Sequence, residues 1–320
     1  MKDNLAYRAA DNRYDLADKI YARCGRSGVL LPRISLGLWK GFGATRPLNE
    51  SMRMIHYAFD HGITHFDLAN NYGPPYGSAE ETFGVIMEQS MRPYRDEMFI
   101  ATKAGYDMWP GPYGNWGSRK YLMASLDQSL QRMKLDYVDL FYSHRYDPNT
   151  PLDETLQALV DVMRQGKALY VGISRWPLKA LQYAAQYLKA HNVPLLTYQG
   201  RFNLLDRAVE DEGILQEVEN IGCGFVSFSP LAQGLLTERY LHGIPADSRM
   251  RTDITLKESA LTPQLFEQLN QLKAEAEAIG LTLPQYALQW VLNHPTVTSV
   301  IVGVSKVEQL KENLALLTNN

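Results

Sequence analysis

Eight short apolar runs recur along the chain, and segments with helical periodicity fill most of the intervals between them. The runs are rich in β-branched and aromatic residues and are apolar on both faces, a pattern typical of parallel strands covered by helices. Eight strands alternating with helices predict an α/β fold, a single (β/α)8 TIM barrel. A doubly wound sheet is the alternative architecture. The expected strands are Ile34–Leu38, His65–Leu68, Met98–Thr102, Val138–Ser143, Leu169–Ile173, Leu195–Gln199, Phe225–Phe228 and Val300–Val302.

Amphipathic segments supply the expected helices. The clearest runs from Leu152 to Met163, with apolar residues recurring every three or four positions. We expect Thr150 to cap this helix, Pro151 to occupy its first position and Gly166 to end it. Similar patterns predict helices at Asn49–His61, Ser78–Glu88, Ser118–Lys134, Pro177–His191, Val209–Ile221, Thr262–Ile279, Leu283–His294 and Lys306–Leu317.

Two further segments complete the expected architecture. Tyr21–Arg23 and Val29–Leu31, separated by the turn Gly25–Gly28, predict a β-hairpin that plugs the barrel floor. The stretch Pro230–Leu261, after the seventh strand, is a long irregular loop, and such loops in compact domains are usually functional, so we expect ligand contacts there. Because no repeat or linker interrupts the series, we expect one domain over residues 1–320.

The charge balance and the distribution of apolar residues exclude several classes of partner. The 320 residues contain 32 Lys and Arg and 35 Asp and Glu, without a long basic run, so we expect no nucleic acid partner. No apolar stretch approaches the roughly 18 residues of a membrane span, and Met1–Ile20 lacks the apolar core of a signal peptide. We therefore expect a cytoplasmic protein without a membrane span. Cys24 and Cys223 are too few for a disulfide framework or a thiolate metal site, so we expect free thiols.

Several common catalytic and nucleotide-binding motifs are missing. The nearest approach to a Rossmann glycine fingerprint, Gly222–Gly224, precedes a strand and lacks the third glycine. The chain has no Walker A sequence and no Gly-x-Ser-x-Gly elbow. His61 and His65 are four residues apart, but the residues between them indicate a helix end entering a strand, which argues against a zinc site.

Polar side chains stand at the ends of three consecutive expected strands. Asp67, Lys103 and His144 hold these positions, and Tyr72 follows in the loop after Asp67. The active site of such a barrel lies at the carboxyl ends of its strands, so we expect the four side chains to converge. The set suits reduction of a carbonyl, with Tyr72 as the proton donor and His144 orienting the carbonyl. We expect Lys103, held by Asp67, to lower the pKa of Tyr72.

These residues lie in sequence blocks that resemble the aldo-keto reductase superfamily. Gly62–Asp67, Asn71–Gly73, Thr102–Lys103 and Tyr142–Arg145 match the family's Asp, Tyr, Lys, His tetrad in order and context, and the resemblance extends from about Tyr21 to Leu317. It implies that Asp67, Tyr72, Lys103 and His144 are the catalytic residues.

The resemblance also implies that NADP(H) is bound across the barrel mouth without a Rossmann fold. Where relatives usually carry a Gly-Lys-Tyr run, this chain has Glu238-Arg239-Tyr240, and because arginine keeps the charge we expect NADP rather than NAD. The implied cofactor-binding residues are Trp39, Asp67, Tyr72, Ser174, Arg175, Gln199, Ser229, Pro230, Leu231, Ala232, Gln233, Gly234, Arg239, Arg249, Gly303, Ser305, Gln309, Glu312 and Asn313. The expected substrate pocket comprises Trp39, Tyr72, Trp109 and His144.

Two segments narrow the resemblance to one branch of the family. Asn70–Glu80 and Lys103–Gly114 are similar to the bacterial L-glyceraldehyde 3-phosphate reductases, which also reduce methylglyoxal. The branch implies a small carbonyl substrate and a homo-oligomer. Arg119 or Lys120 is a candidate contact for a substrate phosphate, the alternative being exposed cations in the first turn of a helix capped by Ser118.

Two other functions stay open at this point. The same branch is similar to the β subunits of voltage-gated potassium channels, so one alternative is a regulatory subunit that keeps NADP bound and turns over slowly. The other alternative is a lyase that forms a Schiff base on Lys103, because barrel aldolases place a lysine at a strand end.

Overall fold

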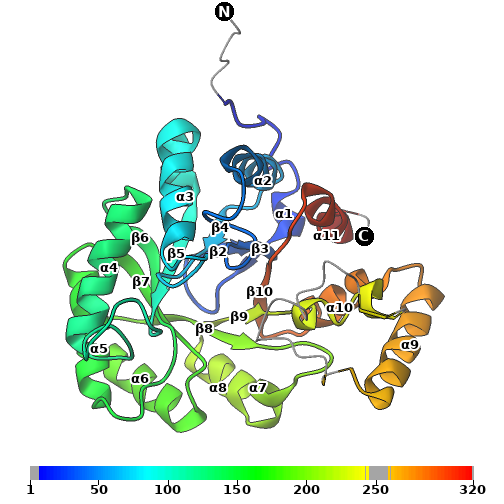
Figure 1. Cartoon of the computed structure of the whole chain (residues 1–320). Coiled ribbons are helices and arrows are strands. Elements are labelled where there is room, and N and C mark those ends of the chain that lie inside the picture. The colour runs from blue at the N-terminus through cyan, green and yellow to red at the C-terminus, as the bar shows by residue number, and fades with distance from the viewer. Residues whose placement is uncertain (1–6, 242, 245–258, 260, 319–320) are drawn as a thin grey trace, which may run out of the picture.

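The computed structural model describes residues 7–241, 243–244, 259 and 261–318. Within these residues, eight parallel strands close a barrel in the order β10-β3-β4-β5-β6-β7-β8-β9. In Figure 1 the helices form a ring around the strands. The closed barrel confirms the predicted fold class and excludes the doubly wound sheet. The strands are β3 (Ile34–Gly37), β4 (His65–Asp67), β5 (Phe99–Ala104), β6 (Val138–Ser143), β7 (Ala168–Ser174), β8 (Leu195–Arg201), β9 (Gly224–Phe228) and β10 (Val297–Val302).

Most helices lie where the apolar periodicity places them. One difference is the segment predicted as one helix at Val209–Ile221, which Gly213 divides because its φ of 77° is incompatible with a helix. Another is the short helix Ala17–Ile20, which was not predicted. The α-helices are α1 (Ala17–Ile20), α2 (Leu48–Asp60), α3 (Ser78–Ile86), α4 (Arg119–Met133), α5 (Leu152–Arg164), α6 (Leu178–Ala190), α7 (Ala208–Asp211), α8 (Ile214–Ile221), α9 (Pro263–Ala278), α10 (Leu283–Leu292) and α11 (Val307–Thr318).

Two predicted helix caps have different outcomes. Ser118 caps α4 as expected, since its side chain accepts a hydrogen bond from the amide of Tyr121. Thr150 does not cap α5: Pro151 occupies the capping position, and the Thr150 hydroxyl donates instead to Asp147 at 2.6 Å. The nearby carboxylate therefore competes successfully for that hydroxyl.

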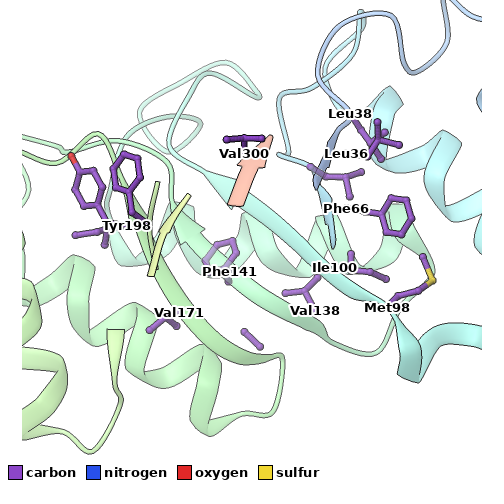
Figure 2. Packing of buried hydrophobic residues seen from close by; sticks show 14 of the residues in the cluster. Leu36, Leu38, Phe66, Met98, Ile100, Val138, Phe141, Val171, Tyr198 and Val300 are labelled. Atoms are coloured by element: carbon purple, nitrogen blue, oxygen red, sulfur yellow. The ribbon is translucent and has the colours of Figure 1, made fainter. Parts of the chain in front are cut away.

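Two apolar layers hold the barrel together. Outward-facing strand residues such as Phe66, Phe141 and Val300 pack beneath the helices, as Figure 2 shows. Inward-facing residues form a second cluster that includes Leu140 and Ile301. Burial of apolar surface on both faces explains why the strands are continuous apolar runs in the sequence.

The predicted hairpin closes one end of the barrel. β1 (Tyr21–Arg23) pairs antiparallel with β2 (Leu30–Pro32). Leu31 and Cys24 are fully buried and belong to the same cluster as the inward-facing strand residues. The hairpin therefore covers the floor, and the opposite end carries the loops that follow the strands.

The long segment after β9 is only partly described. It contains two 3₁₀ turns, Ala232–Gly234 and Glu238–Tyr240, with Leu235 and Tyr240 buried in a small apolar cluster. Among the described residues, no helix has the length and apolar character needed to span a bilayer.

Candidate active site

The four residues singled out at strand ends meet at the open end of the barrel. Asp67 ends β4, Lys103 lies near the end of β5 and His144 directly follows β6. Lys103 Nζ lies 2.5 Å from Asp67 Oδ2 and 3.3 Å from the Tyr72 hydroxyl. The rings of Tyr72 and His144 have centroids 5.9 Å apart. The structure thus brings the predicted tetrad together in one place.

The lysine and the aspartate form an ion pair removed from solvent. The exposed fractions of their side chains are 0% for Lys103 and 3% for Asp67. Lys103 Nζ also donates to the carbonyl of Leu68 at 2.7 Å, and Gln199 Nε2 donates to Asp67 Oδ1 at 3.0 Å. Burial lowers the pKa of Lys103 from its usual value, and the adjacent Asp67 carboxylate opposes that shift.

The pKa of Tyr72 differs from the sequence-based expectation. Burial raises the pKa of this phenol well above 10, and the negative charge of Asp67 raises it further. The expected lowering by Lys103 is therefore wrong for the protein alone, because the low-polarity surroundings outweigh the single hydrogen bond from the lysine. The phenol holds its proton at neutral pH, which is the state a proton donor needs.

His144 is neutral at physiological pH. Burial lowers its pKa well below 6.5, and the cations of Lys103, Arg175 and Arg145 lower it further. The Tyr106 ring packs edge-to-face on the imidazole, with centroids 4.7 Å apart. A neutral imidazole facing Tyr72 offers a hydrogen-bond donor to a carbonyl oxygen without adding charge.

A cavity of about 690 Å³ opens over these side chains, a size typical of small-molecule sites. It runs from the ends of β3 and β4 to the first half of α11, along the ends of β7, β8, β9 and β10. The predicted residues that line it are Trp39, Asp67, Tyr72, His144, Ser174, Arg175, Gln199, Ser229, Pro230, Leu231, Gln233, Gly234, Arg239, Gly303, Ser305, Gln309, Glu312 and Asn313.

Some predicted site residues lie elsewhere. Ala232 belongs to the predicted phosphate-wrapping segment but does not line the cavity, and Arg249 lies outside the described residues. Trp109 also does not line the cavity, because its ring packs against Tyr121 at a centroid distance of 5.2 Å.

The two cations considered for a substrate phosphate are engaged outside the cavity. Arg119 forms an ion pair with Asp161 on α5. The Lys120 ammonium lies 5.3 Å from the centroid of the Tyr113 ring. This arrangement favours the interpretation of both residues as exposed cations at the start of α4.

The cavity also contains residues that the sequence did not single out. Tyr106 is three residues beyond Lys103, and its hydroxyl accepts a hydrogen bond from Arg175 at 3.1 Å. Arg201 is two residues beyond Gln199 on β8, so strand alternation was a usable signal for it. Pro284 comes from α10, and no local pattern indicates its position. The other unpredicted lining residues are Gly37, Asn71, Phe228, Thr237, Tyr240, Ile301 and Val302.

The far part of the cavity has the features of a dinucleotide site. Ser229, Gln233 and Gly234 have positive φ angles of 55°, 60° and 99°, and such backbone reversals form concavities that bind phosphates. Arg239 lines the cavity in the same region. The Ser305 hydroxyl donates to the Gln309 side chain at the start of α11. Both side chains are polar groups that suit the hydroxyls of a nucleoside. These residues fit an extended nucleotide with charged phosphates.

The two histidines considered for a zinc site have different surroundings. Among the described residues, no group of three His, Cys, Asp or Glu side chains is placed to hold a metal ion. His65 is buried, with Nδ1 2.8 Å from the Ser35 hydroxyl, whereas His61 is exposed at the end of α2.

Comparisons with known proteins agree with this site. The model of the aldo/keto reductase family matches residues 33–320. The chain is 52% identical over 304 residues to an L-glyceraldehyde 3-phosphate reductase of Escherichia coli strain K12, covering 93% of this chain and 88% of that protein. It is 34% identical to a probable voltage-gated potassium channel subunit beta of Arabidopsis thaliana, covering 92% of this chain and 90% of that protein.

Proposed function

The chain belongs to the aldo/keto reductase family, and on that premise we propose that it reduces small aldehydes, such as L-glyceraldehyde 3-phosphate or methylglyoxal, to alcohols. Members of this family use NADP(H). The main support for this proposal is that Lys103 contacts both Asp67 and Tyr72, with His144 beside the tyrosine ring. The similarity to the bacterial reductase supports the choice of substrate.

Each member of the tetrad has a distinct part in the proposed reaction. NADPH, when bound, supplies the hydride that reduces the carbonyl carbon. Tyr72 gives its proton to the carbonyl oxygen, so the product is an alcohol and the phenol becomes a phenolate. Lys103 stabilises that phenolate because its ammonium lies 3.3 Å from the hydroxyl oxygen. His144 holds the carbonyl oxygen near the phenol, and Asp67 fixes the lysine.

The wider cavity supplies cofactor binding in this proposal. Ser174 and Gln199 lie where the nicotinamide amide would be held, and Trp39 lies near Tyr72 with ring centroids 6.2 Å apart. Arg239 and the segment 229–234 would hold the phosphates, and residues of α11 the adenosine. We also propose a single-domain, cytoplasmic homo-oligomer that removes toxic aldehydes.

A regulatory role is the second candidate, favoured by the similarity to a probable potassium channel subunit beta. In that role the protein would keep NADP bound and turn over slowly. A Schiff-base mechanism on Lys103 is disfavoured, because Nζ already contacts Asp67, the Leu68 carbonyl and Tyr72. An ammonium held in this way lacks the free electron pair that attack on a carbonyl requires.

A substrate panel tests the proposal. The purified full chain is mixed with NADPH and with L-glyceraldehyde 3-phosphate, methylglyoxal or an aromatic aldehyde, and NADPH oxidation is followed by absorbance. NADH replaces NADPH as the control donor. We expect rapid oxidation of NADPH with the small aldehydes and much slower oxidation of NADH. Tight NADPH binding without turnover on any aldehyde would favour the regulatory role instead.

A further inference from the structure

A buried carboxylate outside the tetrad links two of its members. Glu80, the third residue of α3, has no exposed surface. Its Oε1 accepts a hydrogen bond from the Thr102 hydroxyl at 2.5 Å, and its Oε2 accepts one from Arg132 Nε at 2.8 Å. A buried charge of this kind is costly unless it is fully paired, so its position is closely determined.

Glu80 and its partner Thr102 are each next in sequence to a residue that belongs to or holds the tetrad. On one side, the amide of Ala79, the residue before Glu80, donates to the carbonyl of Tyr72 at 3.3 Å. On the other side, Thr102 is the residue before Lys103 on β5. Glu80 therefore joins the helix turn that holds the tyrosine loop to the strand that carries the lysine.

Arg132, on α4, contacts both Glu80 and the loop that carries Tyr72. The Gly77 that precedes α3 has a φ of 90°, and a Cβ placed on it would lie 3.1 Å from Arg132 Cδ. Only glycine accepts both this backbone conformation and this close approach without strain. The Arg132 guanidinium thus packs on the last residue of the tyrosine loop while it pairs with Glu80.

We propose that Glu80 is a positioning residue for the reduction, which through Thr102 and Arg132 holds Tyr72 against Lys103. This inference rests on the proposed function, because it assigns the residue a part in the same reaction. A shift of the phenol relative to the lysine weakens stabilisation of the phenolate, so loss of the contact lowers turnover more than it weakens ligand binding.

The negative charge of Glu80 also acts on Lys103. The ionisable groups around the lysine are Asp67, Tyr72, Tyr142, His65 and His144, together with Glu80. Burial lowers the pKa of Lys103, whereas the carboxylates of Asp67 and Glu80 raise it. Removing the Glu80 charge is therefore expected to lower the pKa of the lysine further, an effect that a purely structural role would not produce.

The test compares Glu80→Gln with a matched control on the full chain. Asp139 is also buried and paired, with Arg95 NH1 at 2.9 Å and the Ile100 amide at 2.7 Å, but it lies at the start of β6, away from the tetrad. Asp139→Asn therefore removes a buried charge at the other end of the barrel. Glu80→Asp keeps the negative charge. Thr102→Val keeps the charges of Glu80 and Arg132 but removes the hydrogen bond from the Thr102 hydroxyl to Glu80.

Two readouts are measured for each variant. The pKa of Lys103 is followed without cofactor or substrate by NMR of protein with ¹³C-labelled lysine, the signal being assigned with Lys103→Met. Turnover of methylglyoxal with NADPH gives kcat and KM across the pH range. The NMR readout does not depend on catalysis, so a wild-type protein that fails to reduce aldehydes would refute the proposed function while the role of Glu80 is still tested.

Distinct outcomes support or overturn the inference. We expect Glu80→Gln to lower the pKa of Lys103 further. It should also lower kcat by about tenfold, with the KM for methylglyoxal and the KM for NADPH each changed less than about threefold. Glu80→Asp keeps the negative charge and should leave the pKa of Lys103 as in the wild type. Thr102→Val should lower kcat without changing the pKa of Lys103. Asp139→Asn should change neither readout. If Glu80→Gln does not fold, an unchanged kcat in Thr102→Val overturns the proposal, as does a Glu80→Gln protein that behaves like Asp139→Asn.

Discussion

Lys103 Nζ lies 2.5 Å from Asp67 Oδ2, and the exposed fractions of the two side chains are 0% and 3%. A buried charge pair on adjacent barrel strands contributes little to stability, because desolvation offsets most of the attraction between the charges. Its value here is chemical, since the pair keeps a cation beside the Tyr72 hydroxyl, which lies 3.3 Å from Nζ. The phenol can then release a proton and be stabilised as a phenolate.

Removing only one partner of this pair should be strongly destabilising. We expect Lys103→Met to lower the free energy of unfolding by about 3–5 kcal/mol, because Asp67 is left as an unpaired buried charge. The double variant Asp67→Asn, Lys103→Met should lose much less, since the introduced amide carries no charge and its oxygen still accepts the hydrogen bond from Gln199. Urea unfolding followed by circular dichroism measures both values. The single variant Asp67→Asn is measured in the same way, and a double variant as unstable as the sum of Asp67→Asn and Lys103→Met would show that the charges are not coupled.

Stability should fall in acid because two histidines are buried in their neutral form. Burial lowers the pKa of His65 to about 4 and the pKa of His144 well below 6.5. The unfolded chain binds protons at these sites below pH 6.5 while the folded chain does not, so protonation favours unfolding. Each histidine should reduce the free energy of unfolding by about 1.4 kcal/mol per pH unit between pH 6.5 and its own folded pKa.

A substitution isolates the contribution of His65. Urea unfolding of the wild type and of His65→Gln at pH 6.0, 5.5 and 5.0 should show a shallower loss of stability in the variant. His61→Gln, at an exposed site on the end of α2, serves as the control. Equal pH dependence in the wild type and His65→Gln would contradict the assignment of His65 as a buried neutral group.

Recognition of the cofactor's 2′-phosphate should depend on Arg239. This arginine lines the cavity, and a guanidinium forms strong paired hydrogen bonds with phosphate oxygens. We expect Arg239→Ala to raise the KM for NADPH about tenfold, a loss of about 1.4 kcal/mol, and to leave the KM for NADH within about twofold. Steady-state kinetics with both donors measures the effect. A proportional rise for both donors would assign the arginine to a phosphate that NAD and NADP share.

Arg119 should not contribute to substrate recognition. Its guanidinium pairs with Asp161 on the surface between α4 and α5, and it does not line the cavity. We expect Arg119→Ala to leave the KM values for L-glyceraldehyde 3-phosphate and methylglyoxal each within about twofold, and to cost less than about 1 kcal/mol of stability. A selective rise in the KM for the phosphorylated aldehyde would restore the interpretation of Arg119 as a phosphate contact.

The sequence predicted those parts of the fold that local patterns determine. The bounds of β1 and β6 match the prediction. β6 is a run rich in apolar and aromatic residues, and β1 lies just before the turn Gly25–Gly28 that joins it to β2. The carboxyl ends of neighbouring strands lie together at one end of a barrel, which is why Asp67, Lys103 and His144 could be singled out as one site. Arg201 followed the same logic and was missed, although it lies two residues beyond Gln199 on one strand.

Other features depend on contacts that the sequence does not contain. Thr150 bonds to Asp147 rather than capping α5, a choice set by how the preceding loop folds back. Pro284 reaches the cavity only because α10 lies beside the far end of the barrel mouth. The raised pKa of Tyr72 arises mainly from its low-polarity surroundings, whereas the sequence indicated only its charged neighbours.

The central claim is that Tyr72 donates the proton during reduction by NADPH. Protein loaded with NADPH is mixed rapidly with methylglyoxal, and a single turnover is followed by the loss of NADPH absorbance for the wild type and for Tyr72→Phe. We expect the variant to react at least about 100-fold more slowly. Its affinity for NADPH, measured by fluorescence titration, should be unchanged. A Tyr72→Phe protein that consumes NADPH at the wild-type rate would contradict the account.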